Sequence, residues 1–322
     1  MDLELSSDQE ALREGVRALC EGRFPMARVR ELAATSGVDP ALWKELGEAG
    51  VFMLRVPEAD GGVGLGVADA AVVFEELGRA LVPGPVVWTH LAAGRRGQVA
   101  GTVVGGVERP APAASAHVVV ESLDALDALA VLDADGVWAI DPSTLDAEPL
   151  AWPLDPLTPV HRVPALPQGE RVGYADAARE WRLAGAVLTA AYQVGMADAV
   201  AELTLAYAKE RQQFDRPIGS FQAIKHMLAD TRVRSEVARA AVYAAAVTLD
   251  DPMVGDPARA AASAKLLAGE AAVTNAKVAT QVHGGMGFTW EVDVHLYLKR
   301  AAVLATQFGG VDAQAERMAA LL

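Results

Sequence analysis

Hydrophobic residues recur every three or four positions along most of this chain, and that spacing predicts helices. Either Ser6 or Ser7 is expected to cap the first helix, because each stands three residues before a capping-box partner, Gln9 or Glu10. Further helices are predicted over 40–49, 69–81, 175–210, 221–249, 256–280 and 290–308, followed by a short terminal helix. Both ends of the chain are therefore predicted to be helical.

The pattern changes between Pro83 and Gly173, where prolines cluster and short β-type runs appear. Asp135-Gly136 is a hairpin signal between the last two of the predicted strands, which cover 98–104, 117–121, 130–132 and 137–140. We therefore expect a mainly α protein with three parts: an N-terminal helical domain (1–90), a small β domain (91–173) and a C-terminal four-helix bundle (174–322).

Composition narrows the class of protein and its partners. Hydrophobic residues make up 52% of the sequence and aromatic residues only 6%, which favours closely packed helices. The formal net charge of -14 argues against nucleic acid and anionic membranes as partners, and no apolar run reaches membrane-spanning length. The chain starts without a basic and apolar leader, and its single cysteine, Cys20, is expected in the core and allows no internal disulfide. These features predict a cytoplasmic location.

Residues 207–230, YAKERQQFDRPIGSFQAIKHMLAD, are predicted to form a helix, a sharp break and a second helix. Pro217 interrupts the first helix, and Ser220 is a candidate N-cap for the second. Cationic and amide side chains gather at the break, namely Arg211, Gln212, Gln213, Arg216 and Gln222. A planar guanidinium beside a helix start suits a phosphate or diphosphate, whereas the simpler alternative is a turn with solvated charges.

A second stretch, residues 281–288 (QVHGGMGF), places three glycines within four positions after a long helix. Glycines at this density permit positive φ or the close approach of another group to the backbone. A helix C-cap followed by a tight turn would account for one or two of them without any ligand.

Together these two stretches resemble the acyl-CoA dehydrogenase family. A third block, PEADGGVGLGVADAAVVFEELGRA at 57–80, extends the resemblance over most of the chain. Each block alone is a weak signal, so their order and spacing carry the assignment. The glycine-rich part of that third block lacks a GxGxxG motif within a βαβ unit, which argues against a dinucleotide-binding fold. The resemblance implies an FAD-dependent oxidoreductase that desaturates a CH–CH bond of an acyl-CoA thioester.

In this family, the C-terminal bundle of one subunit contacts the adenosine and diphosphate half of the FAD that a neighbouring subunit holds. Arg211 matches the arginine that approaches the diphosphate. Gln213, Phe214 and Gln222 match positions that line the same region. Gln281, Gly284 and Gly285 match positions that contact the adenosine end. The resemblance therefore implies an FAD that is shared across a subunit interface.

The family's catalytic glutamate, which removes the α-proton of the substrate, has no counterpart in this sequence. Its usual place near the C-terminus is taken by Gly309, and its second known place falls at about Gly185, so no catalytic residue is predicted. The Thr-Glu-Pro-x-Ala-Gly-Ser type loop that lies against the flavin ring is also missing, and PAPAASAHV (110–118) is a poor substitute for it. The middle β domain is therefore expected to be shortened.

This combination resembles the base-lacking subunit of heterotetrameric (α2β2) actinobacterial steroid acyl-CoA dehydrogenases. Such a subunit implies a partner acyl-CoA dehydrogenase subunit that carries the glutamate, a substrate that is a steroid side-chain acyl-CoA, and electron-transferring flavoprotein as the acceptor. Two alternatives stay open. One is a homomeric enzyme with Glu180, Glu291 or Asp312 as an atypical base, and the other is a flavin-free, non-catalytic scaffold of the same fold.

Four other titratable residues have simpler interpretations. Glu75 and Glu76 are expected on a solvated or interface face of a helix. His226 is expected on a helix face near a subunit contact, and His283 in a turn. Neither histidine has a metal-ligand partner at useful spacing, so no metal site is predicted.

Overall fold

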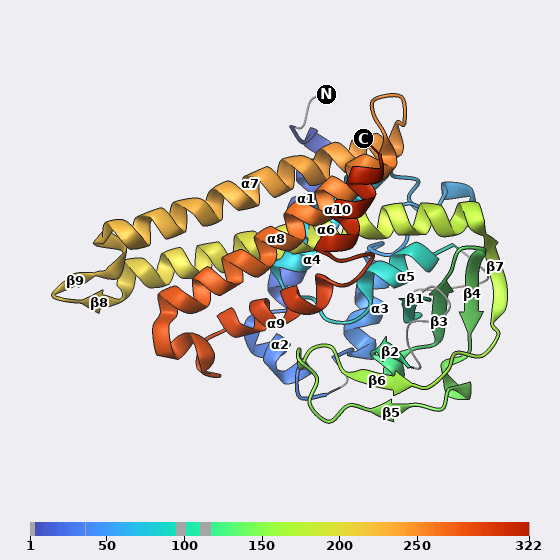
Figure 1. Cartoon of the computed structure of the whole chain (residues 1–322), viewed down its shortest axis with the longest axis horizontal. Coiled ribbons are helices and arrows are strands. Elements are labelled where there is room, and N and C mark those ends of the chain that lie inside the picture. Colours follow the sequence, from blue (N-terminus) through green and yellow to red (C-terminus); the bar gives the residue numbers. More distant parts are fainter. Residues whose placement is uncertain (1–3, 36, 95–100, 110–116, 322) are drawn as a thin grey trace. The chain divides into compact units, whose positions relative to one another are not determined.

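The computed structural model describes residues 4–35, 37–94, 101–109 and 117–321. The chain divides into two compact units. The helical unit contains 1–26, 71–81 and 186–322, and the mixed unit contains 27–70 and 82–185. The predicted class, mainly α with a small β region, is confirmed (Figure 1). The three predicted domain boundaries stay a prediction.

The helical unit consists mainly of long helices whose apolar faces pack together. Its elements are α1 (Ser7–Arg23), the later parts of α4 (Val67–Arg79) and α6 (Ala175–Glu210), α7 (Gln222–Asp250), α8 (Pro257–His283), α9 (Val294–Leu304) and α10 (Val311–Ala320). The buried amide of Asn275 on α8 ties three of these helices together. Its nitrogen lies 3.3 Å from the Ala197 carbonyl oxygen of α6 and 3.0 Å from that of Thr231 on α7. A satisfied buried amide fixes how the helices register, because a slip would leave it unpaired.

The predicted long helices agree with the structure, and the short ones explain most differences. Ser6 rather than Ser7 caps α1, since its hydroxyl accepts a 3.2 Å hydrogen bond from the Gln9 backbone nitrogen. The sequence pattern missed α2 (Met26–Leu32) and α5 (Val86–Ala92), which are too short to show a clear period. Ser220 does not cap α7. It lies in the 3₁₀ turn η4 (Ile218–Ser220), and the N-cap residue is Phe221.

The α6 helix matches its predicted range, 175–210. It is the one helix within the described part of the chain that is long and apolar enough to cross a membrane by length and composition. However, 94% of its most apolar window is buried inside the fold, which is typical of a core helix.

The mixed unit combines short helices with two small sheets. Its elements include α2, α3 (Pro40–Glu48), α5 and the 3₁₀ turns η1 (Glu58–Asp60), η2 (Leu123–Ala125) and η3 (Pro142–Thr144). The first sheet has the order β1 (Val104–Glu108), β3 (Ala128–Leu132), β4 (Gly136–Ile140) and β7 (Glu170–Tyr174), with only β1 and β3 parallel. The second, fully antiparallel sheet has the order β2 (Val118–Glu121), β6 (Val160–Val163) and β5 (Glu148–Pro149).

Side chains from both sheets form one buried core, made of Val107, Val120, Leu123, Leu129, Val131, Ile140 and Val163. The predicted hairpin at Asp135-Gly136 is confirmed, because β3 and β4 pair antiparallel with Leu132 opposite Val137. The first predicted strand is misplaced, since β1 begins at Val104 where the prediction ended. Residues 98–100 of that prediction, and 110–116 of the segment compared with the flavin loop, lie outside the described residues.

Candidate functional site

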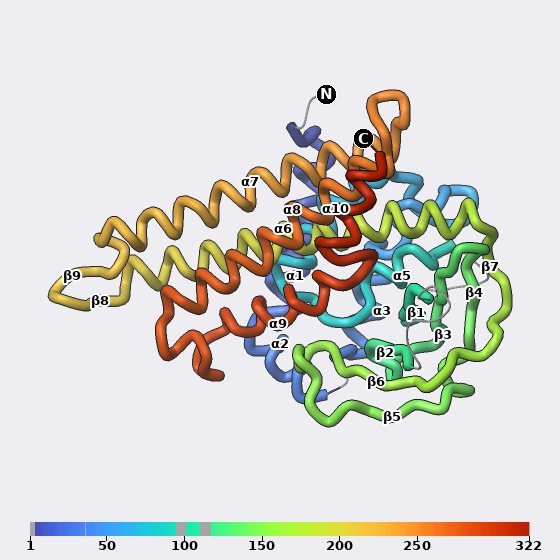
Figure 2. Tube along the Cα trace, in the orientation of Figure 1, coloured from blue at the N-terminus to red at the C-terminus, as the bar shows by residue number. Residues whose placement is uncertain are grey.

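The break between α6 and α7 is a two-stranded hairpin, which Figure 2 traces at the end of those helices. The strand β8 (Gln212–Gln213) pairs antiparallel with β9 (Arg216–Pro217). Phe214 and Asp215 form the turn, with φ of 53° and 60°. Positive φ at both central residues is the geometry of a type I′ turn, whose twist suits a two-residue hairpin. The sequence predicted a break here but not its hairpin form.

The hairpin presents Arg211 to solvent at the C-terminal end of α6. The Arg211 backbone is held at both sides, since its nitrogen donates to Tyr207 O and its carbonyl oxygen accepts from the Ile218 nitrogen, each at 2.8 Å. Its exposed guanidinium forms no hydrogen bond or ion pair with the described residues. The neighbouring Arg216 differs, because its guanidinium lies over the Phe221 ring at 4.1 Å. Arg211 is therefore the hairpin cation whose fork of donors is available to an anion.

The structure brings the two predicted stretches together at one end of the helical unit (Figure 1). The Tyr207 ring of α6 stacks on the His283 ring of α8, with centroids 4.0 Å apart. The His283 Nδ1 atom lies 2.8 Å from the Ala279 carbonyl oxygen, which only accepts, so Nδ1 carries the proton. Burial lowers the pKa of His283, and this residue ends α8 instead of lying in the expected turn. A stacked pair of rings thus joins the ends of α6 and α8.

The glycines after α8 have different structural reasons. Gly284 adopts φ +62° and ψ -140°, a conformation that needs glycine. At Gly287 a Cβ atom would lie 2.5 Å from the Thr280 carbonyl oxygen, so a side chain is excluded by packing. Gly285 has neither constraint, because its Cβ would meet nothing within 4 Å among the described residues. The bare backbone at Gly285 is therefore open to an external group.

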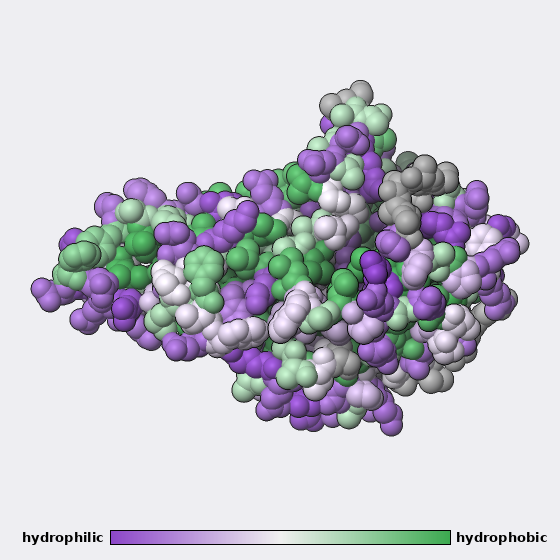
Figure 3. Space-filling view, turned by 60° about the horizontal axis from the view of Figure 1, so that its bottom comes forward, coloured by the Kyte–Doolittle hydropathy of each residue, from purple (hydrophilic) through white to green (hydrophobic). Residues whose placement is uncertain are grey.

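All seven predicted cofactor contacts lie in the helical unit and are exposed: Arg211, Gln213, Phe214, Gln222, Gln281, Gly284 and Gly285. Two aromatic side chains on the same surface are largely exposed, Phe214 at 86% and Phe288 at 79%. Figure 3 shows hydrophobic residues gathered at this end of the unit. Exposed aromatic residues of this size are typical of a surface that another molecule covers. No ligand contact was predicted from the sequence for Phe288, the last residue of the glycine-rich stretch, or for Trp290, two residues later.

Neither place of the family's base carries a titratable side chain. Gly309 has φ +94°, and a Cβ there would lie 2.8 Å from Gln314 Nε2. The same Nε2 donates to the carbonyl oxygen of Phe308 at 2.6 Å. Gln314 of α10 therefore holds the turn that precedes this helix. Gly185 is a buried residue of α6. The carboxylates considered as atypical bases are exposed: Glu180, Glu291 and Asp312.

The expected solvated face of Glu75 and Glu76 is wrong, because both side chains are buried. Glu76 accepts two hydrogen bonds from Arg17, of 2.9 and 2.6 Å. Glu75 accepts 2.9 Å hydrogen bonds from Arg239 and from the Tyr243 hydroxyl. Burial raises the pKa of Glu75, while the positive charge of Arg239 opposes that rise. These carboxylates link α1, α4 and α7 inside the helical unit.

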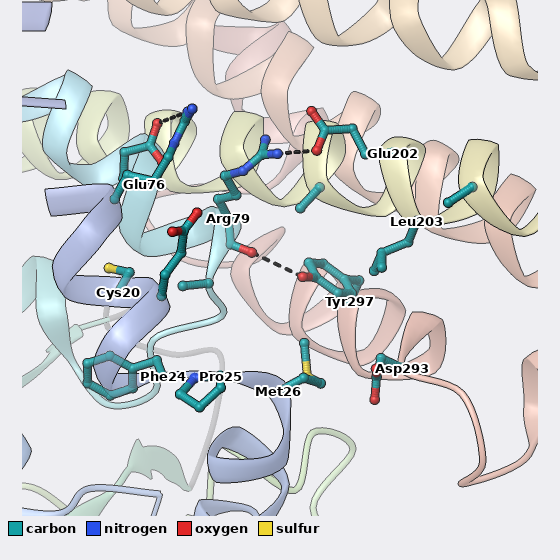
Figure 4. Close-up of a pocket in the computed structure, with 15 residues that line it drawn as sticks. Cys20, Phe24, Pro25, Met26, Glu76, Arg79, Glu202, Leu203, Asp293 and Tyr297 are labelled. Atoms are coloured by element: carbon teal, nitrogen blue, oxygen red, sulfur yellow. Dashed lines mark hydrogen bonds and ion pairs between the residues drawn. The ribbon is translucent and has the colours of Figure 1, made fainter. Parts of the chain in front are cut away.

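A cavity of about 510 Å³ lies beside this cluster, between α1, α4, α6 and α9 (Figure 4). Its apolar wall includes Phe24 and Leu203. The two arginines that line it are already paired, Arg17 with Glu76 and Arg79 with acidic residues of α6, Asp198 and Glu202. Because its guanidiniums are engaged by carboxylates, we do not assign the diphosphate to this cavity.

The wall of the cavity also contains Cys20, whose thiol we expect to react slowly. Burial raises the pKa of the Cys20 thiol to about 12, with Glu76 and Glu21 adding to the rise. Because the thiolate is the reactive form, we expect native Cys20 to react with an aromatic disulfide reagent at least about a hundredfold more slowly than in denaturant at pH about 8. The rates can be followed by absorbance, and equal rates in the two states would contradict a protonated, core Cys20.

Comparison with known proteins agrees with the architecture. The model of the acyl-CoA dehydrogenase N-terminal domain matches residues 6–99, and that of the acyl-CoA dehydrogenase C-terminal domain matches residues 180–322. The acyl-CoA dehydrogenase IpdE2 of Mycolicibacterium smegmatis is 37% identical over 98% of this chain and 99% of its own length. The acyl-CoA dehydrogenase FadE34 of Mycobacterium tuberculosis is 34% identical over 99% of this chain, which corresponds to only 48% of FadE34.

A solved structure is similar over the whole chain. The structure described as the Tcur3481-Tcur3483 steroid ACAD G363A variant has a TM-score of 0.83 and 25% identity, covering 98% of this chain and 97% of its own. Two helical segments flanking a small β region thus define an acyl-CoA dehydrogenase type of fold. The chain belongs to the acyl-CoA dehydrogenase family of FAD-dependent oxidoreductases acting on CH–CH bonds.

Proposed function

We propose that this chain is the base-lacking subunit of a heteromeric acyl-CoA dehydrogenase. It contributes contacts to the adenosine and diphosphate end of an FAD whose reactive end a partner subunit binds. The observation that carries the proposal is the contrast within one chain: glycines stand at both places of the base, whereas Arg211 and Gly285 keep an exposed guanidinium and an open backbone. The FAD supplies the hydride acceptor, and the partner's glutamate supplies the base.

The residues present fit the nucleotide end of the cofactor. A diphosphate is a dianion, and the Arg211 fork can donate two parallel hydrogen bonds to it. Gly285 lets a ligand approach the backbone without meeting a side chain, and the exposed Phe214 and Phe288 offer apolar contact area beside it. The Tyr207–His283 stack holds the two halves of this surface at a fixed spacing. We therefore propose that the seven exposed residues predicted from the sequence contact an FAD that is shared across the interface with the partner subunit.

The names of similar proteins support the partner and the substrate class. The Tcur3481-Tcur3483 structure carries two protein names and is described as a steroid ACAD. FadE34 is about twice as long as the segment that this chain matches, which leaves room in that protein for a second acyl-CoA dehydrogenase unit. We therefore propose a second, glutamate-bearing subunit in an α2β2 assembly in the cytoplasm. Its substrate would be a steroid side-chain acyl-CoA and its acceptor an electron-transferring flavoprotein.

Arg211→Ala in the chain co-expressed with its partner tests the cofactor contact. A charge-assisted hydrogen bond contributes about 1.5–3 kcal/mol, so we expect FAD to bind about 10- to 150-fold more weakly. Flavin per assembly, measured by absorbance after gel filtration, should fall while the assembly stays intact. Arg211→Lys should recover only part of the loss, because an ammonium lacks the planar fork. Arg216→Ala is the matched control and should retain flavin, since Arg216 is engaged with the Phe221 ring.

The same preparations distinguish the alternatives. Unchanged flavin content in Arg211→Ala would favour the flavin-free scaffold. A yellow preparation of this chain alone that oxidises an acyl-CoA at full rate would favour the homomeric enzyme, and Glu180, Glu291 and Asp312 would then be the bases to test. One flavin for each pair of unlike subunits is the result that the proposal requires.

A further inference from the structure

A lysine is buried in the helical unit without a counter-ion. Lys265 on α8 is only 2% exposed, and its ammonium donates to the Leu304 carbonyl oxygen at 3.0 Å. No ion pair joins it to a carboxylate within the described residues, and burial lowers the pKa of Lys265 to about 8. An ammonium has three donors, so one carbonyl leaves it under-solvated. Leu304 ends α9, directly before the turn that contains Gly309.

A buried amide lies beside this lysine on the neighbouring helix. Gln193 of α6 is fully buried, and neither its Nε2 nor its Oε1 atom has a hydrogen-bond partner among the described residues. Thr189, one turn earlier on the same helix, is also fully buried with an unpartnered hydroxyl. An unpaired buried amide or hydroxyl costs free energy comparable to a lost hydrogen bond, so such groups usually bind an ordered water.

The space between these groups is created by a glycine. Gly269 lies one turn after Lys265 on α8. A Cβ built on it would be 3.7 Å from Gln193 Nε2, 3.8 Å from Gln193 Oε1 and 4.0 Å from Lys265 Nζ. These are ordinary contact distances, whereas a Cβ at Gly287 would meet backbone at 2.5 Å. Gly269 thus leaves a gap of about methyl size, bordered by one cation and both ends of an amide.

We propose that this gap binds one ordered water molecule, which accepts a hydrogen bond from Lys265 and pairs with the Gln193 amide. Water fits the chemistry because it both donates and accepts, and the groups that border the gap are polar. A halide could accept from Lys265 but could not donate to Gln193 Oε1. The water solvates the ammonium and so supports the contact of Lys265 with the Leu304 carbonyl oxygen, which holds the last turn of α9. This inference does not rest on the proposed function.

Gly269→Ala tests the water site, because the added methyl group fits the gap without a clash but displaces its contents. With a water present, the substitution should lower the thermal midpoint by a few degrees, since Lys265 and Gln193 lose their shared partner. With a dry gap, it should raise the midpoint, because alanine fills the space and has a higher helix propensity than glycine. Gly15→Ala is the matched control, since Gly15 is helical and its Cβ would meet nothing within 4 Å.

Two further measurements complete the test. In a Lys265→Met background, which removes the charge that needs solvation, the loss caused by Gly269→Ala should shrink or change sign. A crystal structure of the unsubstituted protein at high resolution should show a water within hydrogen-bond distance of Lys265 Nζ and the Gln193 amide. An empty gap there, or a Gly269→Ala midpoint that rises as much as that of Gly15→Ala, would overturn the proposal even if one of the variants failed to fold.

Discussion

Gly195→Ala is expected to prevent stable folding of the helical unit or to lower its free energy of unfolding by about 3–5 kcal/mol. A Cβ at Gly195 of α6 would lie 1.8 Å from the Glu75 carbonyl oxygen of α4 and 2.8 Å from the Arg79 nitrogen. Both are backbone atoms, so no side-chain rotation relieves the contact. The two helices would have to separate by more than about 1 Å, which breaks close packing along the whole crossing.

A second glycine, on α4, lies at the same crossing, and we expect its substitution to have the same effect. A Cβ at Gly78 of α4 would lie 1.9 Å from the Tyr192 carbonyl oxygen of α6. Urea denaturation followed by circular dichroism should therefore show both Gly195→Ala and Gly78→Ala far less stable than the unsubstituted chain. Gly22→Ala in α1 is the control, because its Cβ would meet nothing within 4 Å. This variant should be at least as stable as the unsubstituted chain. A small effect at Gly195 would mean that α4 and α6 do not cross as closely as described.

These glycines show which part of the fold the sequence could not predict. The long helices α6, α7 and α8 were predictable because many turns repeat one apolar pattern. The crossing of α4 and α6 was not, because a glycine in an alanine-rich helix gives no sign of which backbone it meets. The same holds for Glu75 and Glu76, whose partners Arg239 and Arg17 are 164 and 59 residues away in the sequence. Two adjacent glutamates indicate a polar face until those partners are known.

The residues of the candidate site could be named from the sequence, whereas the packing around them could not, for a physical reason. Arg211 and the glycines at 284–287 are local motifs, and the resemblance joined them before their positions in space were known. The hairpin form depends on Phe214 and Asp215 both adopting positive φ, which neither residue type favours strongly enough to predict. The Tyr207–His283 stack depends on helix packing, so the sequence placed His283 in a turn instead of a buried helix end. The role of the seven contacts stays a prediction that the flavin measurement tests.

The second large effect is expected at Arg239, the cation beside the buried Glu75. Arg239→Met leaves the Glu75 carboxylate with only the Tyr243 hydroxyl, and removing one partner of a buried ion pair costs about 3–5 kcal/mol. Arg239 also contacts Asp198 at 3.1 Å, but Asp198 keeps Arg79 and Arg232 as partners, so most of the loss comes from Glu75. The thermal midpoint of the variant should therefore fall well below that of the unsubstituted protein at neutral pH.

The loss at Arg239 should depend on pH, with a sign set by Glu75. Burial already raises the pKa of Glu75 above its usual value, and without Arg239 the opposing attraction is gone, so the pKa rises further. A carboxyl whose folded-state pKa lies above its unfolded value destabilises the fold when ionised, and this penalty is relieved as the pH falls through the folded pKa. The midpoint difference between Arg239→Met and the unsubstituted protein should therefore be smaller at about pH 5 than at about pH 8.

Arg232→Met on the same helix separates burial from charge. Arg232 pairs with Asp198 at 2.6 Å and with Glu236 at 2.6 Å, but its side chain is 59% exposed, compared with 17% for Arg239. Asp198 is buried but keeps Arg79 and Arg239 when Arg232 is replaced, and an exposed arginine contributes about 0–1 kcal/mol, so this variant should remain close to the unsubstituted protein at both pH values. Adding Glu75→Gln to Arg239→Met should recover part of the lost stability and remove the pH dependence, because no buried carboxylate then needs a proton. Equal losses for Arg232→Met and Arg239→Met would show that the number of ion pairs, and not the burial of Glu75, determines the stability of this cluster.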